Sequence, residues 1–528
     1  MSSARFFQTI TSSSRAYYGF AFLSGVCGAG ALAPFDFAPA FFVPMGAAIL
    51  VLDRASHWSM ALKAGWWLGF GYFLAGLWWL GAAFLVEPQF IWAMPFAVLG
   101  LPALLALFFA GGFGLAYLLW RPGLMRLVCL ALALAWSEAL RGVVFTGFPW
   151  NSLGMSLGSS LLLAQSASLF GVNGLNFIAV VLFAAPTLWF TEQKRSTQIA
   201  ALCVSVFGFV SLAAFGAYRL SQPAPPSVPD IHLRIMQPSI AQDEKFSPEQ
   251  SRSILSLYLS LSTKGSYPLA EGMKGITHLI WPETAFPFLL DHSPEARREI
   301  ATILKNDALL LTGAVRAEDK PDRSGRYYFN AIQVLDQNGQ ITGSADKVHL
   351  VPFGEYLPLG DILDVIGVRD FIAAPGGFTA GKERFAIDVP HWPITLPLIC
   401  YEAIFSSELQ LSDQARPGVL LNVTNDAWFG QTAGPWQHFS QARLRAIEQG
   451  VPMIRAANSG ISAILDPYGR DITRLGLGER GVIDGDLPEA LPPTLYFRLS
   501  ATPFSTLWLF SGLIVLLFTL GQLIPRRV

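Results

Sequence analysis

The stretch AGWWLGFGYFLAGLWWLGAAFLV at residues 64–86 decides the fold class, because it is apolar throughout and carries no charged side chain. About 20 apolar residues are enough for a helix to cross the hydrocarbon core of a bilayer. Six further apolar runs lie in the first half of the chain, and an eighth run lies near its end. The eight runs cover roughly residues 17–35, 39–52, 64–86, 90–120, 127–141, 172–191, 197–218 and 504–524. The sequence therefore predicts a multi-pass α-helical membrane domain with eight transmembrane helices.

Charged residues are unevenly distributed along the chain. Of the 36 Lys and Arg and the 37 Asp and Glu residues, only 15 lie within residues 1–219. The chain that follows, up to about residue 493, has the composition of a globular domain and is long enough to bury a core. We therefore expect a transmembrane domain of seven helices at 1–221, an extracytoplasmic domain at 222–493, and a final transmembrane helix with a short cytoplasmic tail at 494–528. The net charge of −1 indicates no nucleic-acid partner.

Basic residues are found in alternate loops between the predicted spans. They are Arg5, Arg15, Arg54, Lys63, Arg121, Arg126, Lys194, Arg195, Arg526 and Arg527. The intervening loops at 36–39 and 87–89 contain neither Lys nor Arg. Loops rich in Lys and Arg stay in the cytoplasm. We therefore expect both termini in the cytoplasm, and the large domain between the seventh and eighth spans on the opposite side of the membrane.

Short apolar strands alternate with helical stretches in the large domain, a pattern typical of an α/β fold. Strands are expected at 231–236, 278–281, 309–315, 327–335, 394–400, 419–423, 461–465 and around 483, and helices at 247–263, 293–305 and 437–449. Two of these strands end at or just before a reactive residue, Glu283 or Cys400. Because ligands gather at the carboxyl ends of strands in α/β sheets, both residues are candidates for a site.

Cys400 is the only cysteine in the large domain, so it has no partner there for a disulfide. Such a residue is either a small buried hydrophobe or a reactive thiol. A nucleophilic thiol needs a base or a nearby positive charge. Glu283 offers a carboxylate, and Lys347 offers an ammonium that also stabilises an oxyanion. We interpret the three as a set for acyl transfer, although Glu283 could instead cap a helix and Lys347 could lie at the surface.

Several motifs resemble the carbon–nitrogen hydrolase (nitrilase) superfamily. They are WPET at 281–284, KVHLVPFGEYLP at 347–358, ICYE at 399–402 and NDAWFG at 425–430. GPWQHF at 434–439, the helix with Arg443 and Arg445, and FTGFPW at 145–150 resemble the apolipoprotein N-acyltransferase family more narrowly. A nitrilase-like domain between the seventh and eighth spans is also similar to that family, so the resemblance covers essentially the whole chain.

The resemblance implies a role for each residue of the triad. Glu283 matches the general base, Lys347 the lysine on the oxyanion side, and Cys400 the nucleophile. It also implies an αββα sandwich for the large domain and a ping-pong reaction through a Cys thioester. The acyl chain would pass from a phospholipid to the N-terminal α-amino group of the S-diacylglyceryl-cysteine of a lipoprotein. The enzyme would lie in the bacterial inner membrane as a monomer, with its catalytic domain in the periplasm.

Four further residues match supporting positions of the family. Glu355 matches an additional essential acidic residue, and Tyr401 and Glu402 match the pair that follows the nucleophile. The backbone N–H of Tyr401 would donate to the oxyanion. The family often has a tryptophan in a mobile arm where this chain has Phe246, which keeps an aromatic ring but loses the indole N–H. No cofactor is implied, and no metal is expected because no second His or Cys stands at zinc spacing from His349.

Two other functions stay open from the sequence. A membrane-tethered nitrilase-like amidase acting on a small amide would need only one anchor. A channel or transporter with a regulatory nitrilase-like domain would need charged or polar residues in several spans. Glu138 and Arg141 are the ionisable pair inside a predicted span, where such residues are functional candidates. At this spacing on a helix they can equally pair with each other. The apolar loops 145–153 and 161–163 either fold back structurally or guide lipid tails.

Overall fold

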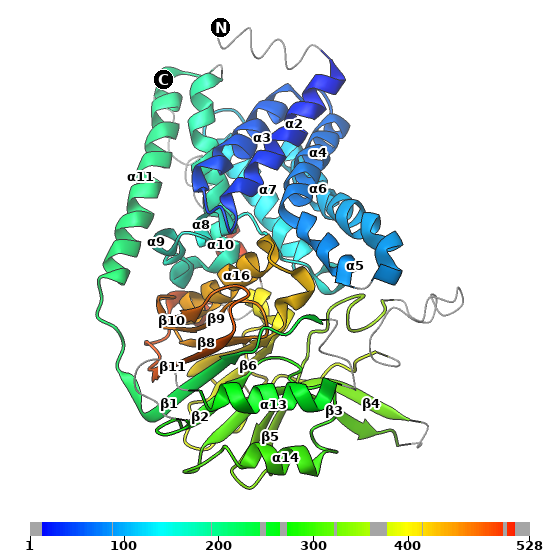
Figure 1. Cartoon of the computed structure of the whole chain (residues 1–528). Helices are drawn as coiled ribbons and strands as arrows, with labels where there is room; N and C mark the ends of the chain where they lie inside the picture. The colour runs from blue at the N-terminus through cyan, green and yellow to red at the C-terminus, as the bar shows by residue number, and fades with distance from the viewer. Residues whose placement is uncertain are drawn as a thin grey trace. The chain divides into compact units, whose positions relative to one another are not determined.

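The computed structural model describes residues 13–86, 88–191, 193–242, 250–264, 272–321, 325–358, 377–413, 415–499 and 504–512. The chain divides into two compact units (Figure 1). The first consists of Met1–Pro223, Ile447–Gln449 and Pro493–Val528, and the second of Ala224–Ala446 and Gly450–Pro492.

The first unit is helical. Its longer helices are α2 (Ser14–Gly28), α3 (Phe42–Arg54), α4 (Trp58–Leu77), α6 (Leu101–Leu119), α7 (Met125–Arg141), α10 (Ala167–Ala184) and α11 (Arg195–Leu220). Short helices are α5 (Ala83–Val86), α8 (Met155–Gly158), α9 (Leu161–Ala164) and α17 (Leu495–Leu499). These elements lie where the sequence predicts apolar spans and their connections.

Within the described ranges, four helical stretches are long and apolar enough to cross a membrane. They are Trp58–Val86, Phe96–Leu119, Ala167–Phe190 and Arg195–Leu220. They coincide with four of the eight expected spans. Helices α2, α3 and α7 contain 15, 13 and 17 residues, fewer than a span of about 20. Most of the expected eighth span, 504–524, falls outside the described residues.

Glycines allow α4 to approach its neighbours closely. A Cβ atom on Gly65 would lie 2.6 Å from the carbonyl oxygen of Phe109 in α6. A Cβ atom on Gly71 would collide with the carbonyl oxygen of Phe22 in α2. Aromatic rings fill the space beside these contacts, as where Tyr72 stacks on Phe109 at a centroid distance of 6.0 Å. Small residues at backbone contacts are typical of helices that pack within a membrane.

Two β-sheets form the centre of the second unit. The first has the strand order β11-β1-β2-β3-β4-β5 and the second β10-β9-β8-β7-β6. Strands β1 to β3 run parallel, as do β6 to β8, and the other neighbours are antiparallel. Their bounds are Ser227–Gln237, His278–Trp281, Leu309–Asp319, Arg326–Leu335, Ile341–Asp346, Thr395–Ile399, Val419–Thr424, Met453–Ala457, Ser462–Leu465, Asp471–Leu475 and Gly481–Pro488 for β1 to β11.

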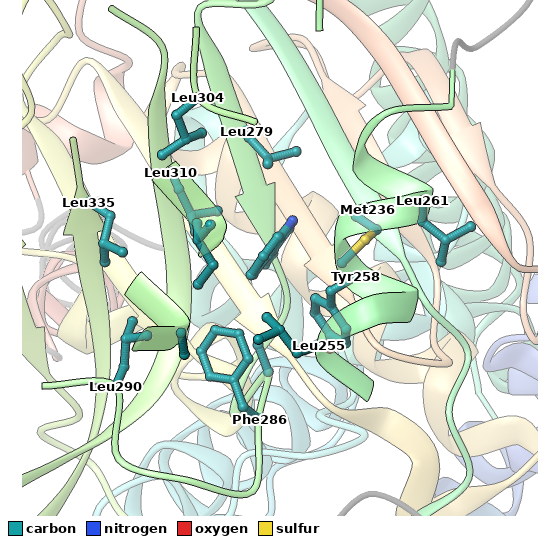
Figure 2. Packing of buried hydrophobic residues seen from close by; sticks show 14 of the residues in the cluster. Met236, Leu255, Tyr258, Leu261, Leu279, Phe286, Leu290, Leu304, Leu310 and Leu335 are labelled. Atoms are coloured by element: carbon teal, nitrogen blue, oxygen red, sulfur yellow. The ribbon is translucent and has the colours of Figure 1, made fainter. Parts of the chain in front are cut away.

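Side chains of the first sheet alternate between its two faces, as strand geometry requires. Leu309 and Leu311 join an apolar cluster that also contains residues of the second sheet. Leu310, between them, joins a second cluster with residues of helices α13 (Ser251–Ser262) and α14 (Pro294–Ala301) (Figure 2). These two helices therefore pack on the face of the first sheet that is turned away from the second sheet.

The second sheet shows the same alternation. Leu421 of β7 joins the cluster shared by both sheets, and Leu420 joins a cluster with Phe439 and Ala442 of helix α16 (Ala433–Gln449). Helices α13 and α14 thus cover the outer face of the first sheet, α16 covers that of the second, and the apolar side chains between the sheets come from both. This layering leaves the strand ends free to carry polar residues.

The strands expected from the sequence are all present, and three further strands, β5, β8 and β10, were not expected. β5 and β10 lie at sheet edges, where side chains are largely exposed and polar, so their sequences lack an apolar pattern. β8 is wholly buried but has Arg455 at its centre, which interrupts an otherwise apolar run. Helix α16 begins at Ala433, four positions before the expected start, and Thr432 caps it.

Candidate active site

The three residues of the triad expected from the sequence each follow the carboxyl end of a strand. Glu283 comes two residues after β2, Lys347 directly after β5, and Cys400 directly after β6. The ammonium of Lys347 lies 3.7 Å from Oε1 of Glu283. The charges of both groups act on the thiol of Cys400. The fold therefore brings the three residues together, although they are far apart in sequence.

The carboxylate of Glu283 is held from two sides. Asn330 Nδ2 of β4 donates a hydrogen bond of 2.7 Å to its Oε1, the same oxygen that faces Lys347. The backbone around it is also confined, because Gly313 of the adjacent strand β3 packs so closely that a Cβ there would meet Cα of Glu283. Ala285 N–H then bonds to the Gly313 carbonyl oxygen at 2.8 Å. Glu283 is thus buried, oriented and placed beside a cation.

Lys347 is buried among carboxylates. Its Nζ lies 2.8 Å from Oε2 and 2.9 Å from Oε1 of Glu355. Glu355 also accepts hydrogen bonds from Val351 N–H at 2.8 Å and from Asn330 Nδ2 at 2.8 Å. Burial by itself lowers the pKa of Lys347, but the negative charges of Glu355 and Glu283 outweigh it and raise the pKa above the ordinary value. Lys347 therefore remains an ammonium at neutral pH.

The thiol of Cys400 is partly buried and carries its proton in the resting site. Burial raises the pKa of Cys400, the carboxylate of Glu283 raises it further, and Lys347 lowers it. Together these effects hold the pKa of Cys400 well above that of an ordinary thiol. Nucleophilic attack by this sulfur would require a base to take its proton, and Glu283 is the carboxylate whose charge acts most strongly on the thiol.

Glu402 ties the cysteine and lysine segments together. Its carboxylate accepts hydrogen bonds from the backbone N–H of Ile399 at 2.7 Å, of Val348 at 2.9 Å and of His349 at 3.0 Å. It also pairs with Arg384 Nη2 at 2.8 Å. Although burial raises the pKa of Glu402, Arg384 overrides it and holds the pKa below the usual range. Glu402 thus connects the segment before Cys400 with the segment after Lys347.

Tyr401 lies in the short 3₁₀ turn Cys400–Ile404 and is buried. Its ring packs edge-on against Phe405 with centroids 4.9 Å apart, and against His349 with centroids 5.6 Å apart. The residue after Cys400 is therefore fixed by aromatic contacts. Phe246, the remaining residue that the resemblance singles out, lies outside the described residues.

Replacing Arg384 with methionine is expected to lower the free energy of unfolding by about 3–5 kcal/mol, because it leaves the buried Glu402 carboxylate without its cation. Because the pKa of Glu402 is depressed, its ionised carboxylate stabilises the folded protein at pH values above the unfolded-state pKa of about 4.3. This stabilisation is lost as the pH falls through the folded-state pKa. The loss in the variant should therefore shrink in acid. Denaturant unfolding of both proteins at neutral and acidic pH measures it. Arg326→Met, at an exposed ion pair with Asp319, is the control and should cost under about 1 kcal/mol.

A second buried polar cluster contacts the backbone of Cys400. His438 of α16 contacts Oδ1 of Asp426 through Nδ1 at 2.8 Å and the carbonyl oxygen of Cys400 through Nε2 at 3.0 Å. Arg455 of β8 pairs with Oδ2 of Asp426 at 2.9 Å and bonds to Asn422. Asn422 Nδ2 in turn donates to the carbonyl oxygen of Leu398 at 3.0 Å. This cluster is therefore bonded to the carbonyl group of Leu398 in β6 and to that of Cys400, which follows the strand.

Sequence reasoning missed the partners that hold the triad. Asp426 and His438 lie in the NDAWFG and GPWQHF motifs, which pointed to the family but not to their contacts. Asn330 stands out only as a polar residue in an apolar strand. Arg384 and Arg455 have no motif that marks them. All of these contacts depend on chain segments that meet only in the folded protein.

Glu138 and Arg141 of α7 form a buried pair in the first unit, with Oε2 and Nη2 2.6 Å apart. Arg141 also donates to the carbonyl oxygens of Trp150, at 2.9 Å, and of Phe148. Glu138 accepts from Leu153 N–H at 3.3 Å. Both charges are thus satisfied by each other and by the loop at 145–153, which supports the structural interpretation of this pair.

Known proteins resemble this chain along most of its length. The model of the apolipoprotein N-acyltransferase N-terminal domain matches residues 24–185, and the carbon-nitrogen hydrolase model matches residues 267–491. An apolipoprotein N-acyltransferase of Rhodopseudomonas palustris is 43% identical over 507 residues, which cover 94% of each chain. That of Sinorhizobium medicae is 45% identical over 491 residues, 91% of each chain.

Among solved structures, an amidase from Nesterenkonia sp. AN1 with an acetamide moiety bound covalently at its active-site cysteine aligns with a TM-score of 0.35 and 17% identity, over 52% of this chain and 96% of that one. The two family models and the long relatives agree on the same assignment. The chain belongs to the apolipoprotein N-acyltransferase family.

Proposed function

We propose that this chain moves an acyl chain from a phospholipid, through a thioester on Cys400, to the N-terminal α-amino group of the S-diacylglyceryl-cysteine of a lipoprotein. The observation that carries the proposal is the meeting of a buried carboxylate, Glu283, and a buried ammonium, Lys347, both acting on the one cysteine of the second unit. The names of the family relatives supply the acceptor class.

In the first half-reaction, Glu283 takes the proton of Cys400 as the sulfur attacks the ester carbonyl carbon of the phospholipid. The negative charge that develops on the carbonyl oxygen is stabilised by Lys347 and by backbone N–H groups such as that of Tyr401. The C–O bond then breaks, and Glu283 returns its proton to the leaving oxygen. A lysophospholipid departs and an acyl thioester remains.

In the second half-reaction, the neutral α-amino group of the lipoprotein attacks the thioester carbonyl carbon. Glu283 accepts a proton from the attacking nitrogen, and Lys347 again faces the oxyanion. The C–S bond breaks as an amide forms, and the sulfur recovers its proton. A thioester suits this reaction because it holds the acyl group while one bulky lipid leaves and the next one enters.

The proposal extends to the arrangement of the chain. Residues 1–221 would form seven transmembrane helices, 222–493 a periplasmic αββα sandwich, and 494–528 the eighth helix and a cytoplasmic tail in the bacterial inner membrane. The alternation of basic loops and the apolar clusters on both faces of each sheet support this arrangement. Glu355 and Glu402 would support the triad, Phe246 would take the place of the arm tryptophan, and the enzyme would act as a monomer.

Incubating the purified protein with phospholipid and no lipoprotein acceptor is expected to leave an acyl group on the Cys400 peptide, because the second half-reaction cannot proceed. Mass spectrometry of the digested protein detects the added mass. The peptides that contain Cys27 and Cys203 serve as internal controls and should remain unmodified. An unmodified Cys400 peptide under these conditions, together with turnover of a small amide, would instead favour the amidase.

A further inference from the structure

The cluster of His438, Asp426 and Arg455 touches the backbone of Cys400 and takes no part in the proposed chemistry. All three side chains are almost completely buried, with at most 1% of their surface exposed. They come from three separate elements, helix α16, the turn after β7, and strand β8. A buried group of this polarity is costly unless its members satisfy one another, and here they do.

The hydrogen-bond geometry fixes what His438 offers to Cys400. The Cys400 carbonyl oxygen, 3.0 Å from Nε2, is an acceptor, so only an N–H on Nε2 can bond to it. Nδ1 can accept from Arg455 Nη2 at 3.2 Å, or carry a second proton toward Asp426 at 2.8 Å. Burial, then Arg455, lowers the pKa of His438, which favours the singly protonated ring. In either protonation state, Nε2–H donates to the Cys400 carbonyl.

This contact falls on a residue with unusual backbone geometry. Cys400 has a φ of +52°, in the left-handed region that residues other than glycine rarely adopt. Such a conformation persists only where neighbouring groups hold it, and it is common at functional sites. On the side before Cys400, Glu402 accepts from Ile399 N–H. On the side after it, the Cys400 carbonyl group is held by His438.

We propose that His438 is a positioning residue, whose Nε2–H holds the Cys400 carbonyl and so keeps the thiol directed at Glu283 and Lys347. Asp426 and Arg455 hold the imidazole ring in the orientation that this contact needs. The proposal rests on the proposed role of Cys400 as nucleophile. It assigns to the GPWQHF motif a function in shaping the nucleophile turn.

Thermal shift and thiol alkylation of the full-length protein in detergent test this assignment. Iodoacetamide labels Cys400, and the rate at that peptide is followed by mass spectrometry across a pH series. His438→Met and His438→Gln form a matched pair, because the two side chains have similar shape but only glutamine has an N–H donor. His438→Leu gives a second donor-free variant if His438→Met does not fold. His292→Gln, at an exposed histidine, is the control.

In His438→Met the rate of Cys400 alkylation at a pH near the ordinary thiol pKa of about 8.5 should rise about tenfold or more, because the thiol leaves its buried position beside the carboxylate of Glu283. The His438→Gln and His292→Gln variants should keep the wild-type rate. An unchanged rate in folded His438→Met, or equal rises in the Met and Gln variants, would overturn the proposal. Because the assay uses no phospholipid, its outcome is independent of whether the acyl transfer proposed above takes place.

Discussion

Replacing Cys400 with alanine is expected to abolish N-acylation, with a loss of roughly 10⁴-fold or more in rate, because no other side chain can carry the thioester. The change removes one sulfur atom from a partly buried position, so the fold should persist. Mass spectrometry of lipoprotein N-termini measures the effect in cells whose only copy of the enzyme is the variant. The expected products are lipoproteins that keep a free α-amino group.

Cys400→Ser is the matched comparison, because serine is similar in size to cysteine and can form hydrogen bonds. Its hydroxyl group is far less acidic than the thiol and is therefore a much weaker nucleophile at this site. It should be nearly as inactive as the alanine variant. Cys203→Ala removes a thiol of the first unit and should leave N-acylation unchanged. Undiminished N-acylation in the Cys400→Ala cells would rule out Cys400 as the nucleophile.

Replacing Lys347 with methionine has the second largest expected effect, because it acts on both catalysis and stability. Without the ammonium, the oxyanion loses its cation, and acyl-enzyme formation should slow by roughly 10²–10³-fold. The carboxylates of Glu283 and Glu355 would also face each other without a counter-ion, which should lower the free energy of unfolding by about 3–5 kcal/mol. The rate of acyl-adduct growth on the Cys400 peptide and denaturant unfolding measure the two effects.

The raised pKa of Lys347 also determines how the difference in the free energy of unfolding between the wild type and Lys347→Met depends on pH. Because the pKa of Lys347 is raised in the folded protein, its stabilisation is complete below the unfolded-state pKa of about 10.4 and is lost as pH rises through the folded value. The stability difference between the wild type and Lys347→Met should therefore change little up to about pH 9 on account of this group. The exposed Lys382→Met is the control. Wild-type acylation rates in Lys347→Met would show that the ammonium is not required.

The three residues of the triad could be named from the sequence, because each lies in a distinctive motif and two of them follow predicted strands. WPET places Glu283 and ICYE places Cys400 at strand ends, and the lysine begins the segment that turns at FGEY. What the sequence could not supply was the distance between them. The 3.7 Å separation of Lys347 and Glu283 depends on β4, whose Asn330 bonds to both carboxylates of the site.

The supporting network lay beyond sequence reasoning for a physical reason. Arg384 reaches Glu402 from a segment with no apolar pattern, and Arg455 lies in the middle of a buried strand where an arginine argues against a strand. Both are stabilised by partners that only the fold brings near. The same reason explains why β8 was missed, since a buried charge is tolerated there only because Asp426 pairs with it.

The protonated thiol of Cys400 has a consequence for the chemical durability of the enzyme. Peroxides and mixed disulfides attack thiolates, so a cysteine that keeps its proton at rest oxidises slowly. Because the second unit contains no second cysteine, a sulfenic acid on Cys400 would have no resolving thiol within that unit to reduce it. Burial and the neighbouring Glu283 carboxylate, which raise the pKa of Cys400, therefore also protect its sulfur from oxidation.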